Sequence, residues 1–172
     1  MKCVNHEAVI DSIMEQYEKA CMDMSVVYGP YSVGKTYIAK ELQNRLTSNH
    51  VVYLLGRLAN ESVHIRSIER GLDMPSGSFR TLEEALRRVF QMSVDKHMMF
   101  IIDDYPALVD TAPQVPILLR ELMETYRDYG KMFVLLMGTH VDELKGRILG
   151  ESSLIAPYIH SYFKLEPFTL DD

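Results

Sequence analysis

The residues with the clearest chemical potential form one short stretch, from Gly29 to Thr36. The stretch reads Gly-Pro-Tyr-Ser-Val-Gly-Lys-Thr and matches an eight-position pattern in which a glycine-rich loop ends in Gly-Lys-Thr. An apolar run that ends at Tyr28 precedes it, and a helical pattern follows. Glycines let the backbone curl until successive N–H groups point inward, and the start of the helix adds partial positive charge. Such a nest suits the oxygens of a polyphosphate.

In this interpretation the stretch is a Walker A motif, or P-loop. Lys35 would reach the β- and γ-phosphates of a nucleoside triphosphate, and the Thr36 hydroxyl would bind Mg²⁺. The predicted nucleotide-binding residues are Gly29, Pro30, Tyr31, Ser32, Val33, Gly34, Lys35, Thr36 and Tyr37. The alternative is a chance glycine-rich turn in front of a helix.

Two acidic residues follow a second apolar run, from Met98 to Ile102. If that run is a buried strand, Asp103 lies at the carboxyl edge of the sheet, where ligands of open α/β sheets bind. Asp103 would hold Mg²⁺ there, usually through water, and Asp104 would orient or deprotonate an attacking water molecule. A solvated pair of acids at the end of a strand is the structural alternative.

A third apolar run, from Phe133 to Met137, is followed by Gly138, Thr139 and His140. A polar side chain at this point would lie between the two other strand ends and contact the γ-phosphate or its water. Thr139 is the first candidate and His140 the second. A polar residue that merely leaves a strand would give the same pattern.

The apolar runs alternate with amphipathic patterns, and this alternation defines the expected elements. Strands are expected at 24–28, 51–55, 98–102, 132–137 and 162–165, and helices near 9–17, 34–46, 61–70, 82–92, 115–129 and 141–149. Thr81 and Glu84 form the pattern of a capping box ahead of one helix. Strands that are apolar on both faces and alternate with helices indicate a parallel sheet between two helical layers. The expected class is α/β, a three-layer αβα sandwich of P-loop type.

Composition limits the classes of function. The chain has 172 residues, of which 47% are apolar, so it fits one domain with a sizeable core. Its formal net charge of −6 argues against a broad nucleic-acid footprint. The arginines between Arg57 and Arg88 are interleaved with acids, which favours a solvated mixed surface over a basic strip.

Cysteine usage and hydropathy indicate the compartment. Cys3 and Cys21 have neither the number nor the spacing of a disulfide or zinc framework. No stretch approaches the roughly 18 apolar residues of a membrane span, and the N-terminus has no signal-peptide pattern. We therefore expect a cytoplasmic protein with free thiols and no membrane partner.

The chain as a whole resembles the archaeal-type ATPases of the AAA+/STAND branch of P-loop proteins. The segments that carry the resemblance are Val4–Glu7, Tyr28–Thr36, Ile101–Tyr105, Val115–Leu119, Leu136–Thr139 and Leu165–Phe168. The resemblance implies a five-stranded sheet in the order 5-1-4-3-2, with ATP or ADP and Mg²⁺ as ligands. It also implies a helical lid and further domains beyond residue 172, so that residues 1–172 would be the nucleotide-binding domain of a longer protein.

The resemblance also suggests partners. In such families the lid and a neighbouring subunit often complete the active site, so self-association is expected. Nucleic acid or an effector protein would bind through domains outside this chain.

The chain departs from the family pattern at four places. His6 replaces an arginine, Asp104 replaces a glutamate, Thr139 and His140 replace serines, and Pro157 and Tyr158 replace a Gly-Arg pair. Arg120 and Arg147 are candidate substitutes for the missing arginine, with an ordinary surface position as the alternative.

The leading functional hypothesis is ATP hydrolysis coupled to conformational change. Lys35, Asp104 and Thr139 would be the catalytic residues, and Thr36 and Asp103 would hold Mg²⁺. The departures at Asp104 and at Pro157 and Tyr158 motivate a second hypothesis, a nucleotide-binding switch with little turnover. A small-molecule kinase is a third, although a helix precedes the first strand and the chain after residue 132 carries a single arginine.

Overall fold

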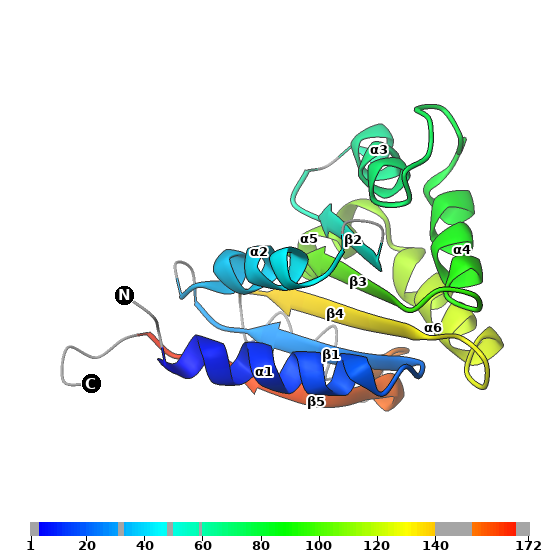
Figure 1. Cartoon of the computed structure of the whole chain (residues 1–172). Helices are drawn as coiled ribbons and strands as arrows, with labels where there is room; N and C mark the ends of the chain where they lie inside the picture. The colour runs from blue at the N-terminus through cyan, green and yellow to red at the C-terminus, as the bar shows by residue number, and fades with distance from the viewer. Residues whose placement is uncertain (1–3, 31–32, 48–49, 59, 140–152, 168–172) are drawn as a thin grey trace.

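Five parallel strands form the centre of the molecule. The computed structural model describes residues 4–30, 33–47, 50–58, 60–139 and 153–167. The strands are β1 (Asp23–Tyr28), β2 (Val51–Leu55), β3 (Met98–Asp103), β4 (Met132–Gly138) and β5 (Ile159–Lys164). They pair in parallel in the order β2-β3-β4-β1-β5, which is the predicted order read from the other edge (Figure 1). The α/β class and the strand order are confirmed.

Helices cover both faces of the sheet. They are α1 (Val4–Glu18), α2 (Lys35–Arg45), α3 (Glu61–Gly71), α4 (Leu82–Met92), α5 (Tyr105–Thr111) and α6 (Val115–Thr125). Buried side chains of α1 and α2 share one apolar cluster with alternate strand residues, and those of α3 to α6 share a second cluster on the other face. This arrangement confirms the three-layer sandwich. Among the described residues, no helix has the length and apolarity to cross a membrane.

Three elements differ from the sequence prediction. α5 was missed, because it has only seven residues and begins directly after the acids that end β3. α6 ends at Thr125 instead of 129, and a turn follows in which the Gly130 amide donates to the Tyr126 carbonyl. β5 begins at Ile159 instead of 162. Its start was missed because this edge strand alternates between half-buried and exposed residues and shows no continuous apolar run. The helix expected at 141–149 lies outside the described residues.

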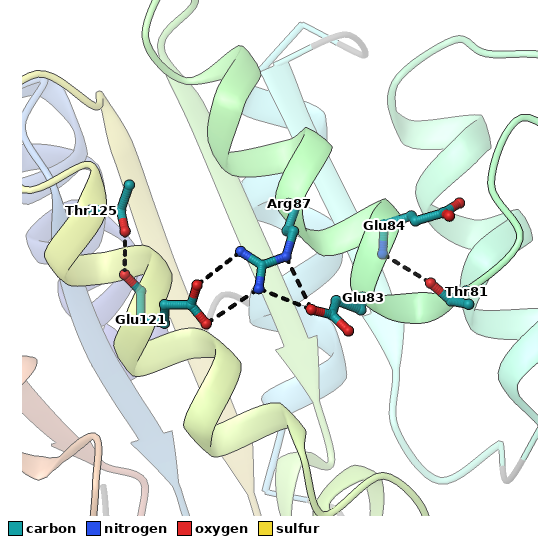
Figure 2. Close-up of polar contacts among 6 residues, drawn as sticks. All are labelled: Thr81, Glu83, Glu84, Arg87, Glu121 and Thr125. Atoms are coloured by element: carbon teal, nitrogen blue, oxygen red, sulfur yellow. Dashed lines mark hydrogen bonds and ion pairs between the residues drawn. The ribbon is translucent and has the colours of Figure 1, made fainter.

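Polar contacts on the surface join α4 to its neighbours. The Thr81 hydroxyl accepts a 3.1 Å hydrogen bond from the Glu84 amide and caps α4, as predicted (Figure 2). Arg87 of α4 binds Glu83 on its own helix and Glu121 of α6, at 2.9 and 3.0 Å. Because these side chains are about half exposed, each ion pair contributes below about 1 kcal/mol.

A similar surface contact joins the first two helices. Near the end of α2, the Arg45 guanidinium binds Glu7 and Asp11 of α1, at 2.7 and 2.9 Å. The helix that follows the glycine-rich loop is thus tied to the N-terminal helix both in the core and at the surface.

The buried hydroxyl of Tyr105 supplies a stability test. Tyr105 begins α5 and is 1% exposed, and its hydroxyl has no hydrogen-bond partner among the described residues. A buried polar group without a partner costs about 1–3 kcal/mol. We therefore expect Tyr105→Phe to raise the free energy of unfolding by about 1 kcal/mol, measured by urea denaturation. The control is Tyr17→Phe, which removes a hydroxyl that donates to the His97 carbonyl and should lower stability. A Tyr105→Phe variant that is less stable than the wild type would contradict this account.

Candidate functional site

The glycine-rich loop connects β1 to α2 at the carboxyl edge of the sheet. β1 lies between β4 and β5, and both neighbours hold the start of the loop. The Gly29 amide donates to the Gly138 carbonyl at 3.3 Å, and the Leu165 amide donates to the Tyr28 carbonyl at 2.8 Å. Tyr31 and Ser32 lie outside the described residues. The rest of the loop therefore starts from a position that both neighbouring strands fix.

The end of the loop depends on Gly34 and on contact with His6. Gly34 precedes α2 with φ of 101°, a left-handed conformation that residues with a Cβ rarely adopt. A Cβ at this position would lie 2.4 Å from Cε1 of His6. His6 is 6% exposed, and its Nε2 donates to the Val33 carbonyl at 2.6 Å. The histidine of α1 thus holds the loop from the side, a contact that the sequence pattern did not indicate.

Lys35 lies inside the loop. Its side chain is 9% exposed, and Nζ donates to the carbonyls of Gly29 and Pro30, at 2.6 and 2.7 Å. Burial lowers the pKa of Lys35, while the charges of Asp103 and Asp104 act in the opposite direction. An ammonium group has three N–H donors, and these carbonyls use two of them. The structure thus brings together the predicted lysine and both predicted acids.

Asp103 ends β3 and is 8% exposed. Its Oδ2 accepts a 2.6 Å hydrogen bond from the Tyr53 hydroxyl of β2. Burial and the bond to Asp103 raise the pKa of Tyr53, so the phenol remains a donor. Tyr53 was not predicted from the sequence. Its hydroxyl inside an otherwise aliphatic run was a signal, but the partner depends on the pairing of β2 with β3.

Asp104 has a strained backbone that Gly56 supports. Its φ of 51° is left-handed, and it precedes α5 as the N-cap residue. The Gly56 amide donates to the Asp103 carbonyl at 2.7 Å, and a Cβ on Gly56 would lie 2.4 Å from the Asp104 carbonyl oxygen. The loop after β2 therefore packs directly against the turn that carries both acids. Gly56, like Tyr53, was not predicted as part of the site.

The remaining predicted residues lie around this centre. Thr36 and Tyr37 are exposed in the first turn of α2, and Tyr37 is 44% exposed. Thr139 follows β4 directly and is half-buried. Because β4 lies between β1 and β3, Thr139 belongs to the same edge as the loop and the acids. His140 lies outside the described residues.

The candidate arginines are not at this edge in the described part of the chain. Arg120 of α6 lies close to Tyr158, whose hydroxyl donates to Glu124. Tyr158 directly precedes β5, so this group lies at the start of the strand, opposite the loop. Arg147 is outside the described residues.

The oxygen groups of this edge fit a magnesium ion. A hydroxyl (Thr36) and carboxylates (Asp103 and Asp104) are hard oxygen ligands, and Mg²⁺ is commonly held by one or two carboxylates together with substrate phosphates. Within the described ranges, no group of three or more His, Cys, Asp or Glu residues is arranged to hold a metal ion. Thr36 and Asp103 are the residues that the sequence predicts to hold such an ion.

Comparisons with known proteins agree with this arrangement. The sequence model of the ATPase family associated with various cellular activities (AAA) matches residues 25–156. Uncharacterized protein MJECL04 of Methanocaldococcus jannaschii is 22% identical over 165 residues, which cover 95% of this chain and 36% of that protein. The chain therefore spans about a third of the length of this relative.

Solved structures share the fold. The ORC2 protein of Aeropyrum pernix, in ADPNP–ADP complexes, is 16% identical with a TM-score of 0.70, covering 95% of this chain and 47% of that one. Cdc6p of Pyrobaculum aerophilum is 16% identical with a TM-score of 0.67, covering 98% and 47%. At these identities the similarity concerns the fold, and the chain spans about half of each of these proteins.

Two glycines with positive φ allow the contact between His6 and the loop to be tested. Gly77 has φ of 87°, and a Cβ added there would have nothing within 4 Å, whereas a Cβ on Gly34 would meet the His6 ring. We expect Gly77→Ala to cost about 1 kcal/mol of unfolding free energy, from the backbone alone. Gly34→Ala should cost clearly more, because the imidazole must also move. Chemical denaturation measures both values.

A second substitution separates the cost of the backbone conformation from the cost of the clash with His6. His6→Ala in the Gly34→Ala background should return part of the extra loss, because the clash is removed. Equal losses for Gly34→Ala and Gly77→Ala would mean that His6 does not pack against the loop.

Proposed function

Because the chain belongs to the AAA family of ATPases, as an archaeal-type nucleotide-binding domain, we propose that its loop and edge acids bind ATP with Mg²⁺ and hydrolyse it. One observation carries the proposal. The Lys35 ammonium is buried within its own loop, and the charges of Asp103 and Asp104 act on it. A fixed cation beside two carboxylates at the start of a helix suits a metal–triphosphate complex. Assignment to the STAND branch stays a prediction.

The proposed roles follow from these positions. The third N–H donor of Lys35 would contact the β- and γ-phosphates, and backbone amides of the loop would bind the remaining oxygens. Thr36 and Asp103 would hold Mg²⁺, which neutralises phosphate charge when bound. Electrostatic placement of this kind supplies most of the catalysis in phosphoryl transfer, so no covalent nucleophile is needed.

Asp104 and Thr139 would act on the attacking water. The water oxygen attacks the γ-phosphorus, and the bond from that phosphorus to the bridging oxygen breaks, which releases ADP. The Asp104 carboxylate would orient the water and accept its proton. Thr139, at the end of the strand between the loop and the acids, would contact the water or the γ-phosphate.

The nucleotide and the partners are further parts of the proposal. The A. pernix ORC2 structure is of ADPNP–ADP complexes, which supports an adenine nucleotide here. That residues 1–172 work with a helical lid and further domains stays a prediction, as do self-association, the coupling of hydrolysis to conformational change, and binding of nucleic acid or an effector.

A nucleotide-binding switch is the second candidate function. The observation that favours it is Asp104 itself, whose carboxylate is one methylene shorter than glutamate and whose φ of 51° fixes an uncommon backbone conformation. If that carboxylate does not reach the water, ATP would bind tightly and turn over slowly.

Substitution of Asp104 tests the catalytic proposal. Asn tolerates the left-handed conformation, so Asp104→Asn should fold normally and remove only the negative charge. We expect phosphate release to fall by about 100-fold or more, because a general base contributes about 10²–10⁴-fold. The ATP dissociation constant, measured with a fluorescent analogue, should change less than about threefold. Turnover that survives Asp104→Asn would exclude Asp104 as the base.

Asp104→Glu separates the enzyme from the switch. If Asp104 already places its carboxylate correctly, the longer side chain should not raise turnover. Tight ATP binding without turnover in the wild type, together with turnover gained in Asp104→Glu, would favour the switch.

A further inference from the structure

Tyr53 reaches the magnesium-site carboxylate from the neighbouring strand. β2 pairs with β3 so that Tyr53 lies opposite Ile101 and Leu55 lies opposite Asp103. Side chains alternate along a strand, so Tyr53 and Asp103 project from the same face of the sheet. The Tyr53 side chain therefore reaches across to β3 and toward the carboxyl edge of the sheet. Its hydroxyl there donates to Oδ2 of Asp103 at 2.6 Å.

That face of the sheet also carries the glycine-rich loop. Tyr53 packs against the apolar cluster that includes Ile38 and Leu42 of α2, the helix that begins at Lys35. Tyr53 also lines an open groove of about 400 Å³, together with Gln43 of α2 and Ser67 and Arg70 of α3. Packing on the sheet fixes the ring, and a tyrosine has few rotatable bonds, so the hydroxyl is held in place.

A fixed hydroxyl constrains the aspartate. The carboxylate of Asp103 can rotate about its last bond, and the bond from Tyr53 occupies one of its two oxygens. The other oxygen, Oδ1, is then the one available to a metal ion or to its water. Hydrogen bonds of this kind to ligating groups commonly change metal affinity by about 10–100-fold when they are removed.

We propose that Tyr53 is a positioning residue of the Mg²⁺ site, whose hydroxyl binds Oδ2 of Asp103 and so fixes the orientation in which that carboxylate would meet the metal or its water. The inference rests on the proposed function, because it assumes that Asp103 serves Mg²⁺. It adds a residue from β2 to a site that otherwise draws on the ends of β1, β3 and β4.

Tyr53→Phe tests the proposal, because it removes the hydroxyl and keeps the ring in the core. The readout is the Mg²⁺ concentration that gives half-maximal ATP binding, with the ATP dissociation constant in EDTA measured alongside. We expect the Mg²⁺ midpoint to rise about tenfold and the affinity in EDTA to stay within about twofold. A role in folding alone would lower the urea midpoint and leave the Mg²⁺ titration unchanged, which would overturn the proposal.

Tyr17→Phe is the matched control. Tyr17 contributes to the same apolar cluster, and its hydroxyl donates to the His97 carbonyl at 3.3 Å, before the start of β3. This variant loses a comparable hydroxyl without any contact to Asp103, so its Mg²⁺ midpoint should equal that of the wild type. An equal shift of the Mg²⁺ midpoint in both variants would mean that the effect comes from a general loss of stability, and it would overturn the proposal.

A double-mutant cycle tests the route through Asp103. In the Asp103→Asn background the Mg²⁺ midpoint should already be raised, and Tyr53→Phe should add less than about twofold. A full tenfold effect of Tyr53→Phe in that background would show that the tyrosine acts through another group.

Failure of the two proposals gives different results. If the wild type binds no ATP in a Mg²⁺-dependent manner, the proposed function itself is wrong. If the wild type binds ATP in a Mg²⁺-dependent manner and Tyr53→Phe has the same Mg²⁺ midpoint, only the positioning role of Tyr53 is wrong.

Discussion

The structure of the site depends on one buried positive charge. Moving an ammonium group out of water costs several kcal/mol unless other groups replace its hydration. For Lys35, the replacements are the carbonyl oxygens of Gly29 and Pro30, with further support from the acids at the end of β3. The loop must therefore turn its first carbonyls toward the lysine that follows it. This requirement links the path of the backbone to the chemistry of the site.

The rest of the fold holds the glycine-rich loop and the two acids in place relative to each other. β1 supplies the start of the loop, and the strand order puts β4 directly beside it and β3 one strand further. α1 contributes His6, which fills the space above Gly34 and bonds to the carbonyl of Val33. On the other side, the loop after β2 packs on the turn that carries both acids. Segments distant in sequence thus support the edge of the sheet that carries the loop and the acids.

The parts of the site that the sequence predicted are those with a local signal. Lys35 was found because it ends the glycine-rich motif after one apolar strand, and Asp103 because it comes at the end of another. A parallel sheet brings such positions to one edge. Tyr53, Gly56 and His6 have no local signal of this kind. Their contacts depend on the pairing of β2 with β3 and on how α1 crosses the loop, and these arise only when the chain is packed.

The same distinction applies to the fold. Strands that are buried on both faces, such as β3 and β4, were predicted almost to the residue. The edge strand β5 was predicted three residues too short at its start, because only every second side chain contacts the core. The short helix α5 follows the acids without a break, and nothing in its periodicity distinguishes it from a turn.

Isothermal titration of the chain with ATP, with and without Mg²⁺, tests the central claim most directly. The account requires Mg²⁺-dependent binding that weakens by about 100-fold or more in Lys35→Ala, because a charge-assisted contact is lost and the loop carbonyls lose their donor. Binding of equal strength in the wild type and in Lys35→Ala would contradict it.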